Sequence, residues 1–163
     1  MLASDRVVNT ITQGSGSFQH GHTYIGHPLA CAAALAVQRE ILGQDLCSQV
    51  RQRGEFLRGQ LQEHFADHPH VGDIRGRGLF QAIELVSDRD SAQPFPAHRK
   101  LHARIKQAAQ SRGLLCYPGG GTIDGINGDH VLLAPPFISS EEQLQQAVMA
   151  LAGALTESIA SLA

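Results

Sequence analysis

The first part of the chain has an apolar pattern unlike that of the rest. Every residue from Leu29 to Val37 is apolar, and most are alanine. A helix that is apolar on all sides is buried, and alanines allow its neighbours to approach closely. Pro28 suits the first turn of a helix, and Gly43 suits its end. The pattern therefore predicts a buried helix between Pro28 and Gly43.

Beyond residue 44, amphipathic helices alternate with short strands. The first helix has apolar residues at helical spacing up to Phe65, with Asp45 as its N-cap. The last helix follows a capping box formed by Ser139 and Glu142. After the first helix the sequence predicts a strand at 71–74, a turn at 75–78 and a strand at 79–86. A middle helix follows, with Leu101, Ile105 and Ala108 facing inward and Gly113 at its end. Before the last helix the sequence predicts a strand at 114–117, a glycine-rich loop at 118–129 and a strand at 130–134.

The order of these elements predicts an α+β fold. In residues 45–163, helices would cover one face of a small, mainly antiparallel sheet. Residues 1–44 contain no predicted strands that could cover their apolar helix. We therefore expect two domains, 1–44 and 45–163, of which the first belongs to a larger structure.

Composition and charge restrict the class of protein. Hydrophobic residues make up 42% of the chain and charged residues 17%, as in ordinary globular proteins. A net charge of −2 gives no electrostatic basis for binding nucleic acid or an anionic membrane. The three cysteines are widely spaced, and neither a bilayer-spanning apolar run nor a signal-peptide pattern occurs. These features predict a cytoplasmic protein that binds neither nucleic acid nor membranes.

A glycine- and histidine-rich segment, GSGSFQHGHTYIGHP, occupies residues 14–28 ahead of the apolar helix. Its histidines, His20, His22 and His27, suggest a metal site. However, their spacing lacks a carboxylate or cysteine ligand at the usual interval. A hydrogen-bonded turn explains these histidines better, so we predict no metal.

The same segment has the composition of an anion-binding loop. Helix N-termini attract phosphate through their unpaired N–H groups and the helix dipole. Gly21 and Gly26 allow the backbone to approach a ligand closely, and Thr23 offers a hydroxyl donor. The residues leave two possibilities open, a phosphate site and a simple glycine-rich turn.

Three segments of the chain resemble, in the same order, the class III aminotransferases, a subgroup of the fold-type I pyridoxal-phosphate enzymes. They are GSGSFQHGHTYIGHPLACAAALAV (14–37), VGDIRGRGLFQAIELV (71–86) and GDHVLLAPPFISSEEQ (128–143). The resemblance implies the small C-terminal domain of that fold at 45–163 and the end of the large cofactor-binding domain at 1–44. It also implies that Thr23, with the backbone N–H groups of His22 and Thr23, binds the phosphate of the pyridoxal 5'-phosphate in the other subunit of a homodimer.

The lysine that binds the cofactor covalently in this family has no counterpart in the chain. The segment MLASDRVV resembles the strand that follows that lysine, so we expect the lysine just upstream of Met1. The two lysines that are present, Lys100 and Lys106, fall on the solvent side of a predicted helix. The resemblance therefore implies the C-terminal part of an enzyme, with no catalytic residue and no activity by itself.

Leu132 indicates which kind of substrate the complete enzyme would bind. Family members that act on α-amino acids often carry an arginine at this position, where it binds a carboxylate through two hydrogen bonds. Amine:pyruvate transaminases lack it, so the chain most resembles that type, which acts on an amine and a keto acid. Arg75 and Arg77 are candidates for binding the substrate carboxylate, although arginines in turns usually face water. The loop at 118–129 is a candidate lid at the substrate entrance.

Two alternative functions stay open. A racemase or mutase of the same fold would share all three segments, because the residues around the catalytic lysine are not in the chain. A stand-alone α+β binding module, formed by residues 45–163 without a cofactor, would leave the apolar helix uncovered.

Overall fold

Residues 3–162 are described by the computed structural model, which divides the chain into two units, Met1–Glu40 and Ile41–Ala163. The boundary lies after residue 40, where the sequence suggested residue 44. It therefore falls within a helix and not after one.

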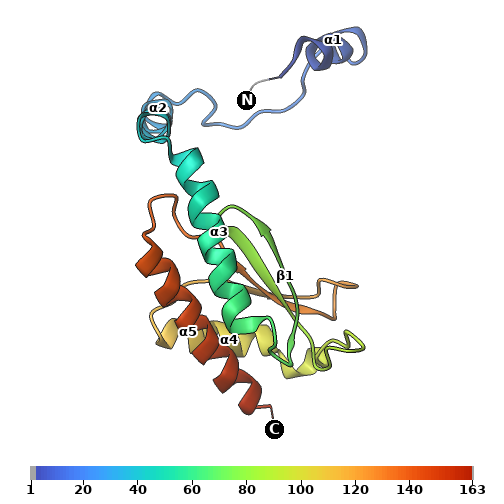
Figure 1. Cartoon of the computed structure of the whole chain (residues 1–163). Helices are drawn as coiled ribbons and strands as arrows, with labels where there is room; N and C mark the ends of the chain where they lie inside the picture. Colours follow the sequence, from blue (N-terminus) through green and yellow to red (C-terminus); the bar gives the residue numbers. More distant parts are fainter. Residues whose placement is uncertain (1–2, 163) are drawn as a thin grey trace. The chain divides into compact units, whose positions relative to one another are not determined.

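The first unit contains helix α1 (Asp5–Gln13) and most of helix α2 (Pro28–Gly43), joined by a long loop (Figure 1). The expectation that MLASDRVV forms a strand is wrong for its described part, because α1 begins at Asp5; Met1 and Leu2 lie outside the described residues. Two backbone N–H groups of the first turn bond to the carbonyl oxygen of Ser4. The Asp5 carboxylate lies in the positively polarised first turn, which favours a helix there.

Helix α2 has the predicted bounds, but its side chains are exposed. No residue of α2 is buried, and Leu29 and Leu42 are 73% and 78% exposed. The described residues therefore do not bury α2, and its burial in a larger structure stays a prediction. A helix that is apolar on all sides requires neighbours to be stable in water. None of the described helices is both long and apolar enough to span a membrane.

The second unit has the predicted order of helix, two strands, helix, two strands and helix, which confirms the α+β fold. A short 3-10 helix, η1, precedes the middle helix. The elements are α3 (Leu46–Phe65), β1 (Val71–Arg77), β2 (Phe80–Leu85), η1 (Ala97–Arg99), α4 (Leu101–Ser111), β3 (Tyr117–Gly120), β4 (Asp129–Leu133) and α5 (Glu141–Ala160).

The four strands form one antiparallel sheet in the order β1-β2-β4-β3. Ile83 of β2 lies opposite Val131 of β4, and both strands bury every second side chain. The pleat thus directs one face of the sheet to the core and leaves the other face open. Helix α3 contacts β1 and α5, and α4 contacts α5, β3 and β4; Figure 1 shows α3 and α5 side by side. The core is formed by Leu57, Leu61, Phe65, Ile83, Leu101, Ile105, Val131, Leu144, Val148, Leu151 and Leu155.

The strand predicted at 114–117 is largely wrong. β3 begins at Tyr117 and continues to Gly120, so most of it falls in the predicted loop. Leu114 instead closes α4: its N–H bonds to the Ala109 carbonyl at 2.9 Å, and its side chain packs against the core. The predicted turn at 75–78 is shorter, because β1 continues to Arg77 and the chain turns after it.

Two predicted helix caps also differ from the structure. The capping box of α5 is formed by Ser140 and Gln143, with N···O distances of 3.2 and 2.9 Å. Ser139, the predicted cap, is buried. Asp45 precedes α3 with φ 46°, and its side chain makes no capping hydrogen bond. The run SSEEQ satisfies the capping rule in two registers, and burial of Ser139 decides between them.

Candidate functional site

The loop before α2 is built from short turns. The Ile25 N–H donates to the His22 carbonyl at 3.0 Å, and the His27 N–H donates to the Tyr24 carbonyl at 3.1 Å. Gly26 has φ +71°, a conformation that glycine adopts without strain. Helix α2 begins directly after His27.

Thr23 lies in this turn with its polar groups free. Its side chain is exposed, and neither its hydroxyl nor its backbone N–H has a hydrogen-bond partner within residues 3–162. The same holds for the backbone N–H of His22. Unpaired donors beside a glycine and ahead of a helix suit an anion. The donors present therefore fit a phosphate group.

Two histidines of the loop pack against aromatic rings. His20 meets Phe18 edge to face with ring centroids 5.8 Å apart, and His27 lies against Tyr24 at 5.4 Å. All three histidines line a pocket of about 550 Å³ together with small apolar side chains of α2. In the part of the chain that the structure describes, no group of three or more His, Cys, Asp or Glu is placed to hold a metal ion.

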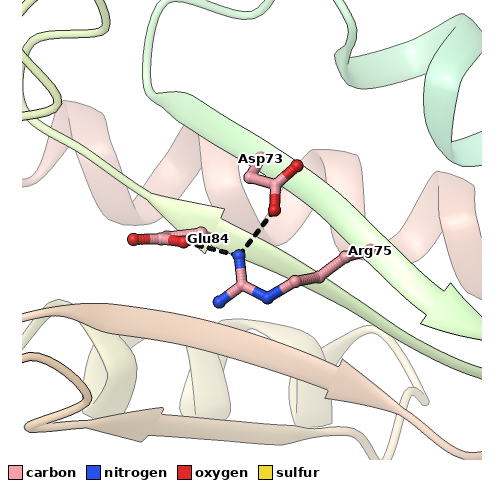
Figure 2. Close-up of polar contacts among 3 residues, drawn as sticks. All are labelled: Asp73, Arg75 and Glu84. Carbon is pink, nitrogen blue, oxygen red and sulfur yellow. Dashed lines mark hydrogen bonds and ion pairs between the residues drawn. The ribbon is translucent and has the colours of Figure 1, made fainter.

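Arg75 lies between two carboxylates on the open face of the sheet. Its Nη1 is 2.6 Å from both Asp73 Oδ2 and Glu84 Oε2. Figure 2 shows the two contacts as dashed lines. Asp73 of β1 and Glu84 of β2 are opposite each other in register. The hydrogen bonds to Glu84 and to Asp73 raise the pKa of Arg75 above its ordinary value. One positive and two negative charges leave this triad with a net negative charge.

Leu132 occupies the same open face, but on another strand. It lies in β4, half-buried, opposite Ala82 of β2 and Tyr117 of β3, so its neighbours in the sheet are apolar or aromatic. Arg75 and Arg77 are on β1, which is separated from β4 by β2. The structure therefore brings neither arginine next to Leu132 in the sheet.

A histidine–carboxylate pair was missed in the sequence. Asp129 is 4% exposed, and its Oδ1 accepts hydrogen bonds from the backbone N–H of His102 at 3.2 Å and from the ring Nδ1 at 2.5 Å. The residues are far apart in the chain, so their contact could not be predicted. The alternation of DHVLL nevertheless contained a signal, because it places Asp129 on the same face as Val131 and Leu133.

Comparison with protein families covers nearly the whole chain. Residues 1–155 match the family model described as aminotransferase class-III. The chain belongs to the class-III aminotransferases. An uncharacterised aminotransferase of Schizosaccharomyces pombe is 41% identical over 161 residues, which are 99% of this chain and 35% of that protein. An adenosylmethionine-8-amino-7-oxononanoate aminotransferase of Anoxybacillus flavithermus is 35% identical over 86% of this chain and 29% of its own length.

Solved transaminases share the fold of this aminotransferase chain. The (S)-enantioselective omega-transaminase from Thermomicrobium roseum superposes with a TM-score of 0.81 and 30% identity, over 96% of this chain and 33% of that one. The α+β layer is thus that of the fold-type I transaminases, and its structural neighbours include the omega-transaminase type. The chain spans about a third of the length of the relatives that it matches.

Both lysines of this aminotransferase chain are exposed, as predicted. Lys100 precedes α4 with φ 50°, and Lys106 lies on the outer side of α4. The described residues therefore include no buried lysine that could bind a cofactor covalently.

Proposed function

We propose that this chain is the C-terminal part of a pyridoxal-phosphate-dependent aminotransferase that moves an amino group from an amine to a keto acid. The observation that carries the proposal is the match of residues 1–155 to the class-III aminotransferase family. The likeness to omega-transaminases over nearly the whole chain supports the amine-accepting type. Residues 1–44 then belong to the large domain and residues 45–163 form the small one.

The loop before α2 would hold the phosphate of the cofactor. The Thr23 hydroxyl and the N–H groups of His22 and Thr23 have no partner within residues 3–162, so they are free to donate to it. Hydrogen bonds to a charged acceptor are stronger than those between neutral groups. Pyridoxal phosphate supplies the electron sink for the amino-transfer chemistry. This chain contributes binding of its phosphate and no catalytic lysine.

The proposed assembly is a homodimer in which Thr23 reaches the cofactor of the other subunit. The exposed apolar surface of α2 supports an assembly, because the described residues leave that helix uncovered. A cytoplasmic location stays a prediction. It rests on the three cysteines, which are free thiols, as is usual in a reducing compartment.

The open sheet face favours an amine over an α-amino acid as the donor. Leu132 cannot bind a carboxylate, and the Asp73–Arg75–Glu84 triad carries net negative charge that would repel one. Arg75 is therefore a poor candidate for the carboxylate of the keto acid. The Arg77 side chain has no hydrogen bond or ion pair within residues 3–162, and it stays a candidate.

A chimaera tests the proposal. The upstream two-thirds of the Thermomicrobium roseum omega-transaminase would be joined to this chain in place of its own C-terminal part. We expect pyruvate-dependent transamination of an amine by the chimaera and none by the 163-residue chain. Thr23→Ala should weaken binding of pyridoxal phosphate to the chimaera roughly tenfold, by loss of a hydrogen bond to a charged group.

The control is Thr12→Ala, since Thr12 is exposed on α1 and its hydroxyl bonds to its own helix. It should leave cofactor affinity unchanged. A folded chimaera that does not transaminate the amine would contradict the proposal. Equal cofactor affinity of Thr23→Ala and the parent chimaera would contradict the assigned role of Thr23.

A further inference from the structure

The loop at 121–128, between β3 and β4, is hydrogen-bonded only within itself. Residues 122–126 are exposed. No hydrogen bond or ion pair joins the loop to another element among residues 3–162. Its backbone bonds are Thr122 N–H to Gly128 O, Ile123 N–H to Asn127 O and Gly125 N–H to Gly121 O. The position of the loop therefore depends on the two strand ends that carry it.

Those strand ends are intrinsically weak. β3 has only four residues, YPGG, and proline and glycine both weaken a strand. Gly120 and Asp129 form the last pair of the ladder before the loop. The β3–β4 hairpin therefore needs support from outside at this pair.

His102, in the first turn of α4, contacts both members of this last pair. Its backbone N–H and ring Nδ1 donate to Asp129 Oδ1 at 3.2 and 2.5 Å. A Cβ atom on Gly120 would lie 2.7 Å from His102 Nδ1, so the ring occupies the space beside that strand end. The Asp129 side chain is 6% exposed, which excludes water from most of the contact. His102 thus supports β3 by contact of its ring and β4 by hydrogen bonds from its backbone and its ring.

We infer that His102 and Asp129 are positioning residues that fix the loop at 121–128. Without the imidazole, the buried Asp129 carboxylate keeps the backbone N–H of His102 but loses its shorter hydrogen bond, and loss of a hydrogen bond to a buried charged group is costly. The strand ends then open, and the loop loses its fixed position. The pair thereby sets where the exposed side chains of Ile123 and Ile126 are presented. The inference concerns the order of the loop and holds whatever reaction the complete protein performs.

Amide hydrogen exchange, followed by NMR on the 163-residue chain, tests the pair. In His102→Ala we expect the Ile123 amide to exchange roughly 10- to 100-fold faster, by loss of a hydrogen bond to a charged group. His102→Asn places an amide donor near the position of Nδ1 and should restore most of the protection. The matched control is His98→Ala, because His98 is an exposed histidine of η1. This variant should exchange like the wild type.

Three results would overturn the inference: unchanged Ile123 exchange in His102→Ala, exchange in His102→Asn as fast as in His102→Ala, or an equal acceleration in the middle of β2. The last result would mean global destabilisation and no local role. If His102→Ala fails to fold, Asp129→Asn is the variant that tests the inference. It should accelerate Ile123 exchange by a smaller factor, and exchange equal to the wild type would refute the pair.

Discussion

At the corner between α3 and β1, His68 is held as a neutral ring. The His70 N–H donates to its Nδ1 at 3.1 Å, so this nitrogen acts as an acceptor. The ring lies near Phe65 and His70, with centroid distances of 6.2 and 6.0 Å. Burial, and to a lesser degree the neighbouring His70, lower the pKa of His68 below its ordinary value of 6.5.

The stability of the chain should therefore depend on pH through His68. Below pH 6.5 the unfolded chain binds more protons at this residue than the folded chain does. The contribution is fully present above pH 6.5 and is lost as pH falls through the lowered pKa. Urea unfolding on both sides of pH 6.5 would measure the fall in unfolding free energy.

His68→Gln should reduce that fall, since glutamine does not titrate. The exposed His98→Gln is the matched control and should keep the wild-type pH dependence. If His68→Gln loses as much stability in acid as the wild type, then the effect arises at other groups.

Single residues were predictable from the sequence only where local composition exposes their chemistry. Thr23 could be selected because glycines and a helix start surround it, and His22 through the family resemblance; their role in binding phosphate stays a prediction. The roles of Arg75 and His102 could not be predicted, because each depends on a partner from another element. Arg75 looked like a turn residue facing water, and only strand register shows that it lies between Asp73 and Glu84.

Helix α3 packs against the turn between β1 and β2 through two glycines. A Cβ atom on Gly54 would lie 2.4 Å from the backbone of Gly78, which cannot rotate away. Gly54→Ala should therefore destabilise the chain by about 1–3 kcal/mol through overpacking. Chemical denaturation of the purified variant would measure this loss.

Gly59→Ala is a control in the same helix. No atom lies within 4 Å of a Cβ at this exposed position. Because alanine restricts the unfolded chain and favours a helix, this variant should gain about 0.4–1 kcal/mol. Destabilisation of both variants to the same extent would mean that the close approach of Gly54 to Gly78 is not the cause.

The elements themselves were largely predictable, and their ends were less so. Hydrophobic periodicity was sufficient for α3, α4 and α5, whose inward residues form the core. It was misleading at 114–117, where apolar side chains anchor the end of α4 and the strand that follows is YPGG. Strands of proline and glycine have no apolar alternation, so they form only where neighbouring strands pair with them.

At the scale of the whole molecule, the buried core of the described chain lies in the second unit. Every buried apolar residue of the described chain lies at or beyond Leu46. Removal of residues 1–40 should therefore change the unfolding free energy by less than about 0.5 kcal/mol, as for surface changes away from the core. Thermal and urea unfolding of residues 41–163 beside the full chain would measure the difference. A large loss of stability would show that the first unit supports the second.

The fold of the second unit followed from its sequence because both sides of each contact are present in it. The partners of α2 could not be predicted in this way, since its apolar residues require neighbours that the described residues do not provide. The apolar pattern of a segment indicates how much of it is buried in the complete protein, and not how much is buried by this chain.

The absence of buried side chains from residues 3–40 also affects how this chain tolerates mutation. A substitution there leaves the core of the second unit intact, so it should change the stability of this chain by itself only slightly. In the second unit, accepted mutations should conserve side-chain volume. In the first, they should conserve the chemistry that the loop and α2 present to their surroundings. Homologous sequences should then conserve different properties on the two sides of residue 40: surface chemistry before it and side-chain volume after it.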